Sequence, residues 1–283
     1  MKILRFFINT YFMKQIILSL AIVLFCFPCS YSQNNQGNIA ISVGPSFPIG
    51  DFASKDIKDN ASGLAKTGAA VTISYSRLSG KQLGISVDLH GQQNPLNISS
   101  MEKSFSETGI SQGFWTVSDP NQPIPPGPYS VYPNWKFKKR SWLMGSLLLG
   151  GYGQFPLTQK GSISFIPKAM IGVIHVSAPR ISGSSITDTA TAYIEQSGSK
   201  AFGFTYSLSG GLKYDCGKKI FFLMNLGYTG TNNIRFKDIT ASITTTKGVF
   251  GSPDYSVQQA VVTGEGRQTI SALNLLVGLG LRL

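Results

Sequence analysis

The chain has 283 residues, of which 42% are hydrophobic and only 13% are charged, whereas about 25% of the residues in an average soluble domain are charged. Its formal net charge is +12. No basic recognition helix, zinc-ligand spacing or RNA-binding aromatic motif accompanies this charge, so we expect no nucleic-acid partner. A basic surface that faces anionic lipid headgroups is the more natural use of the charge.

Residues 1–32 are predicted to be a signal peptide for export through the Sec pathway. Lys14 precedes an apolar run of 13 residues, Ile16 to Pro28, which is too short to span a membrane as a helix. Ser30 and Ser32 supply the small residues before a cleavage site. Met13 would also make a well-formed start. The mature domain is therefore expected to cover residues 33–283.

Eight stretches of the mature chain are predicted to be strands, because apolar and polar residues alternate in them with a period of two. Residues 200–214 show the cleanest alternation. The last stretch has leucine or valine on one face and, apart from Leu276, small or polar residues on the other. A proline inside the fifth stretch, Pro167, predicts a bulge or an interruption there. The stretches are 38–44, 68–78, 82–91, 141–155, 162–178, 200–214, 219–230 and 270–283.

The connections between these stretches alternate between short and long. The long ones follow the first, third, fifth and seventh stretches and are expected to be polar loops, with polyproline-like structure at Asp119 to Pro128. This alternation is typical of outer-membrane barrels, which have short periplasmic turns and long external loops. We therefore predict an all-β fold, an eight-stranded antiparallel up-and-down transmembrane β-barrel with long extracellular loops and both termini in the periplasm.

The other parity of the strands is small or polar, and this predicts a lumen filled by side chains, since eight strands leave little free space. Asp88, Lys213, Asn274 and Arg282 are the candidates for a polar network in this lumen. Asp88 and Arg282 are candidates for an ion pair, although Arg282 could equally extend to the periplasmic interface.

The sequence resembles a family of small barrels. The signal peptide, the segment Gly44 to Ala53 with the sequence GPSFPIGDFA, and the alternating terminal strand are similar to the outer-membrane β-barrel proteins common in Bacteroidota, the OmpX- or PorT-like porin family. The resemblance implies that the outer-membrane assembly machinery recognises the last strand. That strand ends in Leu283, where the family usually has an aromatic residue.

Little in the sequence indicates catalysis. Ser86, Asp88 and His90 share one parity of a strand, and His175 lies in another strand, so a hydrolase that modifies lipid A is one alternative. Residues i and i+2 lie about 7 Å apart along a strand, which we expect to be too far for direct hydrogen bonds, and lumen polarity explains these side chains. We expect no catalytic residue, no metal and no cofactor.

A basic cluster stands just before the fourth strand, at its external end. Lys136, Lys138, Lys139 and Arg140, with Trp142 beside them, are candidates for contact with lipopolysaccharide phosphates, because charge-assisted hydrogen bonds are strong. A solvated loop base is the alternative interpretation.

These patterns favour a non-enzymatic structural or surface-interaction protein of the outer membrane. Its expected partners are membrane lipid, lipopolysaccharide and the assembly machinery, together with a protein partner that the sequence does not identify. A narrow porin-like channel is the second hypothesis. A soluble lipocalin-like binder is the third, and it would require the apolar parity to face inward.

Overall fold

The computed structural model describes residues 37–283 except 58, 60, 109–133, 160, 189 and 248–254. The predicted signal peptide and the proline-rich segment 119–128 lie outside the described residues. Among the described residues, no helix is long and apolar enough to cross a membrane.

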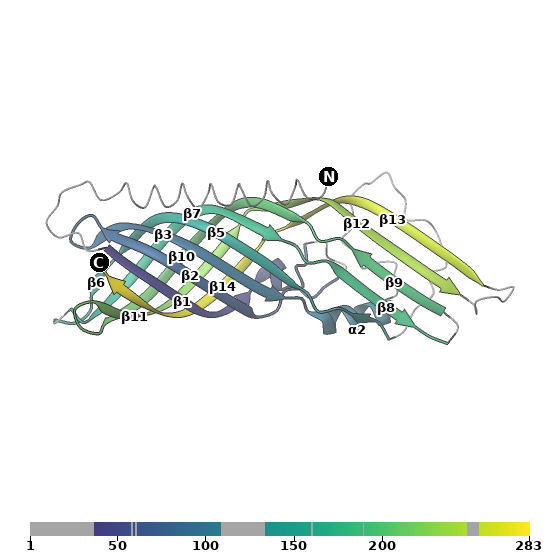
Figure 1. Ribbon diagram of the computed structural model, residues 1–283, viewed down its shortest axis with the longest axis horizontal. Helices are drawn as coiled ribbons and strands as arrows, with labels where there is room; N and C mark the ends of the chain where they lie inside the picture. The colour runs from purple at the N-terminus through teal and green to yellow at the C-terminus, as the bar shows by residue number, and fades with distance from the viewer. Residues whose placement is uncertain are drawn as a thin grey trace, which may run out of the picture. The chain divides into compact units, whose positions relative to one another are not determined.

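Eight antiparallel strands form a closed barrel (Figure 1). Each strand pairs with its neighbour in the order β10-β11-β14-β1-β2-β3-β5-β7, and β7 pairs with β10 to close the sheet. The predicted fold class is confirmed. The strands are β1 Gly37–Pro48, β2 Gly68–Leu78, β3 Leu83–Pro95, β5 Ser141–Gly153, β7 Ile163–Ser177, β10 Lys200–Asp215, β11 Ile220–Thr231 and β14 Ser271–Arg282.

The apolar parity of the strands faces outward. On β7, for example, Ile171 is 59% exposed while its neighbour Met170 is 4% exposed. Asn274 and Thr205 are buried in the interior, and Phe204 is exposed on the outside. An apolar exterior around a closed ring of strands suits lipid, because a closed ring lets neighbouring strands pair their backbone polar groups within the protein. The lipocalin-like alternative is therefore wrong, and the chain is a transmembrane β-barrel of the outer-membrane type.

The two termini of the barrel and its short turns share one end. Asn38 near the start of β1 pairs with Arg282 at the end of β14, and the Leu283 N–H donates to the Gly37 carbonyl. The connections 79–82 and 216–219 are tight turns at this end. The connection from β5 to β7 holds a two-residue strand, β6 Phe155–Pro156, which pairs with β7.

The described parts of the long connections at the other end are folded, and for these residues the expectation of loops at 179–199 and 231–267 is wrong. They form most of a second, five-stranded sheet in the order β13-β12-β9-β8-β4 (Figure 1). These segments are rich in threonine, which favours strands. Many of their residues on both faces are polar, however, so the sequence does not show the apolar–polar alternation that predicts the barrel strands. The strands are β4 Lys136–Phe137, β8 Ile181–Ile186, β9 Ala190–Gln196, β12 Ile234–Lys247 and β13 Ser256–Gln268. A 3-10 helix, η1 Gly50–Ala53, and a helix, α2 Ile98–Thr108, complete this end.

An aromatic core joins this second sheet to the mouth of the barrel. Trp142 of β5 is 1% exposed, and its ring lies 5.7 Å from Phe52 of η1 and 6.0 Å from Phe236 of β12, between centroids. Its indole N–H donates to the Gly63 carbonyl at 2.9 Å. Next to it, Phe105 of α2 packs against Trp135 and Phe137. The end of the barrel opposite the termini is therefore covered by packed side chains.

β1 and β7 each contain a proline that the strand accommodates. β1 continues through Pro45, which pairs with Ala69 of β2, while the ladder to β14 passes from Val43 to Ser46. β7 runs through Pro167 without a shift in register against β10. On the opposite edge of β7, pairing with β5 stops at Tyr152, and pairing with β6 begins at Phe155. Because proline has no N–H to donate, the predicted interruption falls between the partner strands β5 and β6 rather than in β7.

Candidate functional site: the filled lumen and the external rim

A buried ion pair occupies the middle of the lumen. The Lys168 ammonium lies 3.2 Å from both carboxylate oxygens of Asp88. Ser86 donates to Asp88 at 2.9 Å, and Lys168 also reaches the hydroxyls of Ser74 and Ser86 at 3.3 Å. The expected pair between Asp88 and Arg282 is therefore wrong.

Lys168 was missed from the sequence, although a signal was present. It is the only Lys, Arg, Asp or Glu in β7 and shares the inward parity of Ile166 and Met170, both of which are buried. A lysine on an inward position of an eight-stranded barrel requires an acidic partner, because an unpaired charge is costly to bury.

A second polar group lies at the end of the barrel that holds the termini. Arg282 and Asp215 form an ion pair with an N–O distance of 2.7 Å, and Lys213 approaches the same carboxylate at 3.5 Å. The Lys213 ammonium also stands 4.5 Å from the centre of the Phe221 ring. Arg282 cannot serve Asp88 because it lies at the end of its strand, whereas Asp88 is in the middle of β3.

A chain of hydrogen bonds extends from the middle of the lumen toward the end of the barrel opposite the termini. His90 bonds the Thr72 hydroxyl through Nδ1 at 2.9 Å and the Gln92 oxygen through Nε2 at 3.4 Å. Gln92 donates to Asn94 at 2.6 Å, and Asn94 donates to the Lys66 carbonyl at 3.0 Å. Side chains at i and i+2 therefore do bond along β3, contrary to the expectation from strand spacing, because these side chains are long enough to bend toward one another.

The four predicted lumen residues do not form a single network. Lys213 and Arg282 share one group, Asp88 belongs to the middle group, and Asn274 bonds Thr229 at 3.2 Å. Cavities of about 40 Å³ and 20 Å³ lie among these groups. Cavities of this size hold a few water molecules at most.

The geometry does not suit nucleophilic catalysis. In a hydrolytic triad a histidine stands between the serine and the acid, but here Ser86 donates directly to Asp88 while His90 bonds Thr72 and Gln92. His175 faces the outside of the barrel, 4.8 Å from the ring of Phe202. Within the described ranges, no group of three or more histidine, cysteine or acidic residues could hold a metal ion.

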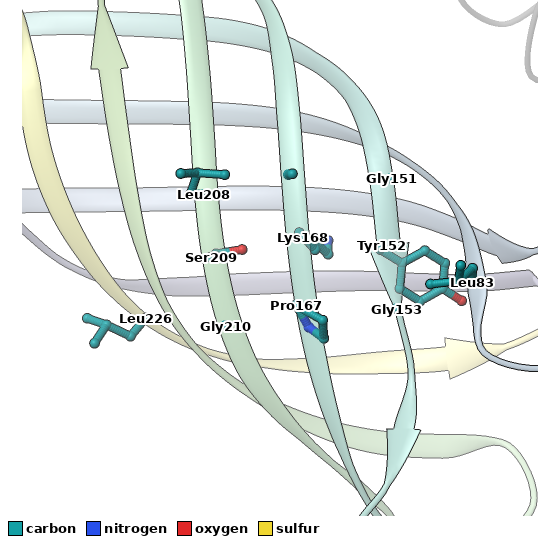
Figure 2. A pocket seen from close by; sticks show the side chains of 11 residues that line it. Leu83, Gly151, Tyr152, Gly153, Pro167, Lys168, Leu208, Ser209, Gly210 and Leu226 are labelled. Atoms are coloured by element: carbon teal, nitrogen blue, oxygen red, sulfur yellow. The ribbon is translucent and has the colours of Figure 1, made fainter.

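A shallow groove of about 700 Å³ crosses the outer wall of the barrel near Pro167. Figure 2 shows Leu208, Pro167 and Tyr152 carried by β10, β7 and β5 around it. Gly151, Gly153 and Gly210 lack side chains, which leaves the surface recessed at this point. Leu83 and Leu226 also line the groove. Its lining is mostly apolar, like the outer surface of the barrel around it.

The predicted lipopolysaccharide contacts separate into two kinds. Lys136, Lys138, Lys139 and Arg140 are exposed where β4 leads into β5. Trp142 is buried in the aromatic core, so it cannot contact lipid and its expected role is wrong. The strand parity explains this, because Trp142 shares the inward face of Met144 and Ser146.

The structure adds exposed cations at the same end of the barrel that the sequence did not group with this cluster. Lys66 bonds the Pro95 carbonyl through its N–H just before β2, and Lys200 begins β10. Lys237 lies beside the β9–β10 connection, where its carbonyl accepts from Ser199 at 2.8 Å. Together with residues 136–140, these lysines follow the rim from β2 through β5 to β10.

The chain has low sequence identity to several solved structures that it resembles. No protein-family model and no curated protein matches the sequence. Among solved structures, a major outer membrane protein from Thermus thermophilus is similar at 12% identity and a TM-score of 0.42, covering 89% of this chain and 100% of its own. Neisserial surface protein A has the same coverage and TM-score at 10% identity. Ail, the attachment invasion locus protein of Yersinia pestis, follows with the same coverage, 10% identity and a TM-score of 0.39.

Proposed function

We propose that this protein is a non-conducting, non-enzymatic barrel of the outer membrane that holds a folded external sheet at the cell surface for interaction. The observation that carries the proposal is the filling of the barrel at successive levels. The Arg282–Asp215 and Lys168–Asp88 pairs lie in the lumen, and the aromatic core around Trp142 covers the outer mouth. These groups occupy the space through which a small solute would have to pass.

Several finer assignments belong to the same proposal. The chain is a Bacteroidota-type barrel of the OmpX- or PorT-like kind, exported through the Sec pathway, with both termini in the periplasm. The assembly machinery recognises β14, whose outward face of alternating leucine and valine is exposed. The short turns support this orientation, since outer-membrane barrels keep short turns on the periplasmic side.

The exposed cations at the external rim hold lipopolysaccharide phosphates. Lys138, Lys139 and Arg140 are exposed and adjoin the first residue of β5, where the barrel meets the outer leaflet in this orientation. Ammonium and guanidinium groups bind phosphate through charge-assisted hydrogen bonds.

Cysteine labelling on intact cells tests the orientation. In a Cys216→Ser background, Val257→Cys on β13 should react with a membrane-impermeant maleimide on intact cells, since Val257 is exposed. Lys81→Cys in the β2–β3 turn is the matched exposed site and should react only after permeabilisation. The reverse pattern would refute the assignment of the sheet to the cell surface.

Planar-bilayer recording tests the absence of conduction. The purified protein should show no resolved single-channel current under conditions in which a known porin conducts. Regular current steps would instead support the narrow channel.

Charge reversal tests the rim. Lys138→Glu with Lys139→Glu should lower the lipopolysaccharide that co-purifies with each barrel, measured by phosphate analysis. Lys218→Glu with Lys219→Glu, an exposed pair in the opposite turn, is the control and should leave it unchanged. Equal losses in both double variants would contradict a specific role for the external rim.

A further inference from the structure

The five-stranded external sheet has two unlike faces. One face is part of the aromatic core, with Phe137 against Gly183 of β8 and with Ala192 and Ile194 of β9 buried. The opposite parity is open. Its central row runs across all five strands as Lys136, Ser184, Tyr193, Thr244 and Gln259, paired in register.

The open face carries hydroxyl groups around an aromatic ring, together with the exposed apolar side chains of Ile186, Val257 and Val261. Tyr193 is 48% exposed and stands between Ser184 and Thr244 in the central row. The next row places Ser182, Glu195 and Ser242 side by side, and Glu195 is already paired with Arg180. Adjacent strands lie roughly 4.8 Å apart, so the central row spans roughly 19 Å.

We propose that this face binds the oligosaccharide of lipopolysaccharide molecules in the surrounding outer leaflet. Each serine or threonine hydroxyl both donates and accepts hydrogen bonds, as sugar hydroxyls do. The exposed ring of Tyr193 supplies a flat apolar surface with a polar tip, which suits the C–H face of a sugar ring. Hydroxyl groups beside an exposed aromatic ring match a polyhydroxylated chain better than they match an acidic protein or a nucleic acid.

Continuity with the basic rim identifies the source of the sugar. Lys136 ends the central row, and the Lys138 N–H donates to the Ser182 carbonyl of the same sheet at 3.0 Å. A lipid whose phosphates rest on Lys138 to Arg140 would therefore carry its oligosaccharide toward Ser184 and Tyr193. This inference rests on the proposed rim contact and extends it from the phosphates to the sugars.

Two variants with matched controls test the site in the full-length protein. The probe is the lipid-free, dephosphorylated oligosaccharide prepared from the host lipopolysaccharide, and binding is followed by saturation-transfer NMR and calorimetry. Tyr193→Ala and Thr244→Val should each weaken binding by about fivefold or more, the effect of losing one good contact. Tyr193→Phe keeps the ring and should retain most of the affinity.

Thr245→Val is the control for Thr244→Val. The two residues are adjacent on β12, but Thr245 pairs with the buried Ala192 on the core face, so its replacement should leave oligosaccharide binding unchanged. Equal losses in the two threonine variants would overturn the assignment of the open face, as would a native protein that does not bind the oligosaccharide.

The rim variants separate this inference from the proposal beneath it. Lys138→Glu with Lys139→Glu should lower co-purified lipopolysaccharide while the dephosphorylated oligosaccharide still binds. Retained rim binding with no oligosaccharide binding would overturn the sugar site alone, whereas loss of neither ligand in any variant would overturn both assignments. A protein ligand whose capture depends on Tyr193, in the absence of oligosaccharide binding, would also overturn the sugar site.

Discussion

Replacing Lys168 by methionine should destabilise the barrel strongly, because Asp88 would remain buried without its cation. The ammonium lies 3.2 Å from both carboxylate oxygens, and both side chains are about 10% exposed or less. At that distance the attraction is roughly 5 kcal/mol at an effective dielectric constant of about 20. The cost of desolvating the two charges offsets much of this, but removal of one partner from a buried pair costs about 3–5 kcal/mol.

The double variant Lys168→Met with Asp88→Asn should recover most of that loss, since no charge is then left in the middle of the lumen. The free energy of unfolding would be measured by urea titration in lipid vesicles, with tryptophan fluorescence as the signal. Lys200→Met, at an exposed lysine of the rim, is the control and should change stability by about 0.5 kcal/mol or less. If Lys168→Met lies within about 1 kcal/mol of the native protein, or if the double variant is as unstable as Lys168→Met, the reasoning about a dry, paired lumen is refuted.

Three further predictions concern the wall, its glycines and the outer core. Ile171→Arg on β7 should lower the free energy of unfolding by about 2–4 kcal/mol if lipid surrounds the barrel. The control is Ile186→Arg on β8, where the side chain is 62% exposed against 59% for Ile171; it should change stability little because that residue meets water. Equal losses of stability in the two variants would contradict a membrane boundary between the two positions. Gly172→Ala should reduce the fraction of folded protein, because the added carbon would stand 1.9 Å from the Leu147 carbonyl oxygen. The folded fraction is measured by the heat-modifiable migration of the protein in gels. Gly145→Ala is the control and should fold normally, since its added carbon meets nothing within 4 Å. Trp142→Ala removes the ring that lies between Phe52 and Phe236. It should therefore lower the free energy of unfolding by about 3–5 kcal/mol and speed proteolysis of the external sheet. An unchanged rate of proteolysis would contradict the coupling of sheet and barrel.

The barrel strands could be predicted because lipid enforces a pattern that the sequence carries openly. A strand between lipid and a small lumen needs large apolar residues at every second position, and β2 accordingly has the predicted bounds of Gly68–Leu78. The contrast between Ile171 and Met170 shows the limit of that signal. Both are apolar, yet one meets lipid and the other fills the lumen, so hydrophobicity alone marks a strand without always marking its outward face.

The ion pairs could not be assigned from the sequence, because they depend on register around the barrel. Asp88 pairs with Leu148 across the β3–β5 ladder, and Leu148 pairs with Gly172 across the β5–β7 ladder. Lys168 therefore stands four residues along β7 from Gly172, the residue that the two ladders place opposite Asp88. The tilt of strands in a barrel brings residues at such staggered positions to the same level. Only the pairing of three consecutive strands fixes this relation.

The external sheet changes how surface function should be understood in this protein. Long loops between barrel strands bind by adapting their shape, and that adaptability carries an entropic cost on binding. Here Phe236 of β12 packs directly on Trp142 of the barrel wall, and Ile194 of β9 lies in the same buried cluster. The surface that carries Tyr193 is therefore fixed to the barrel before any ligand arrives. A fixed surface loses little conformational entropy when it binds a ligand. This favours the open face of the sheet, rather than the turns and loops between strands, as the place where binding occurs.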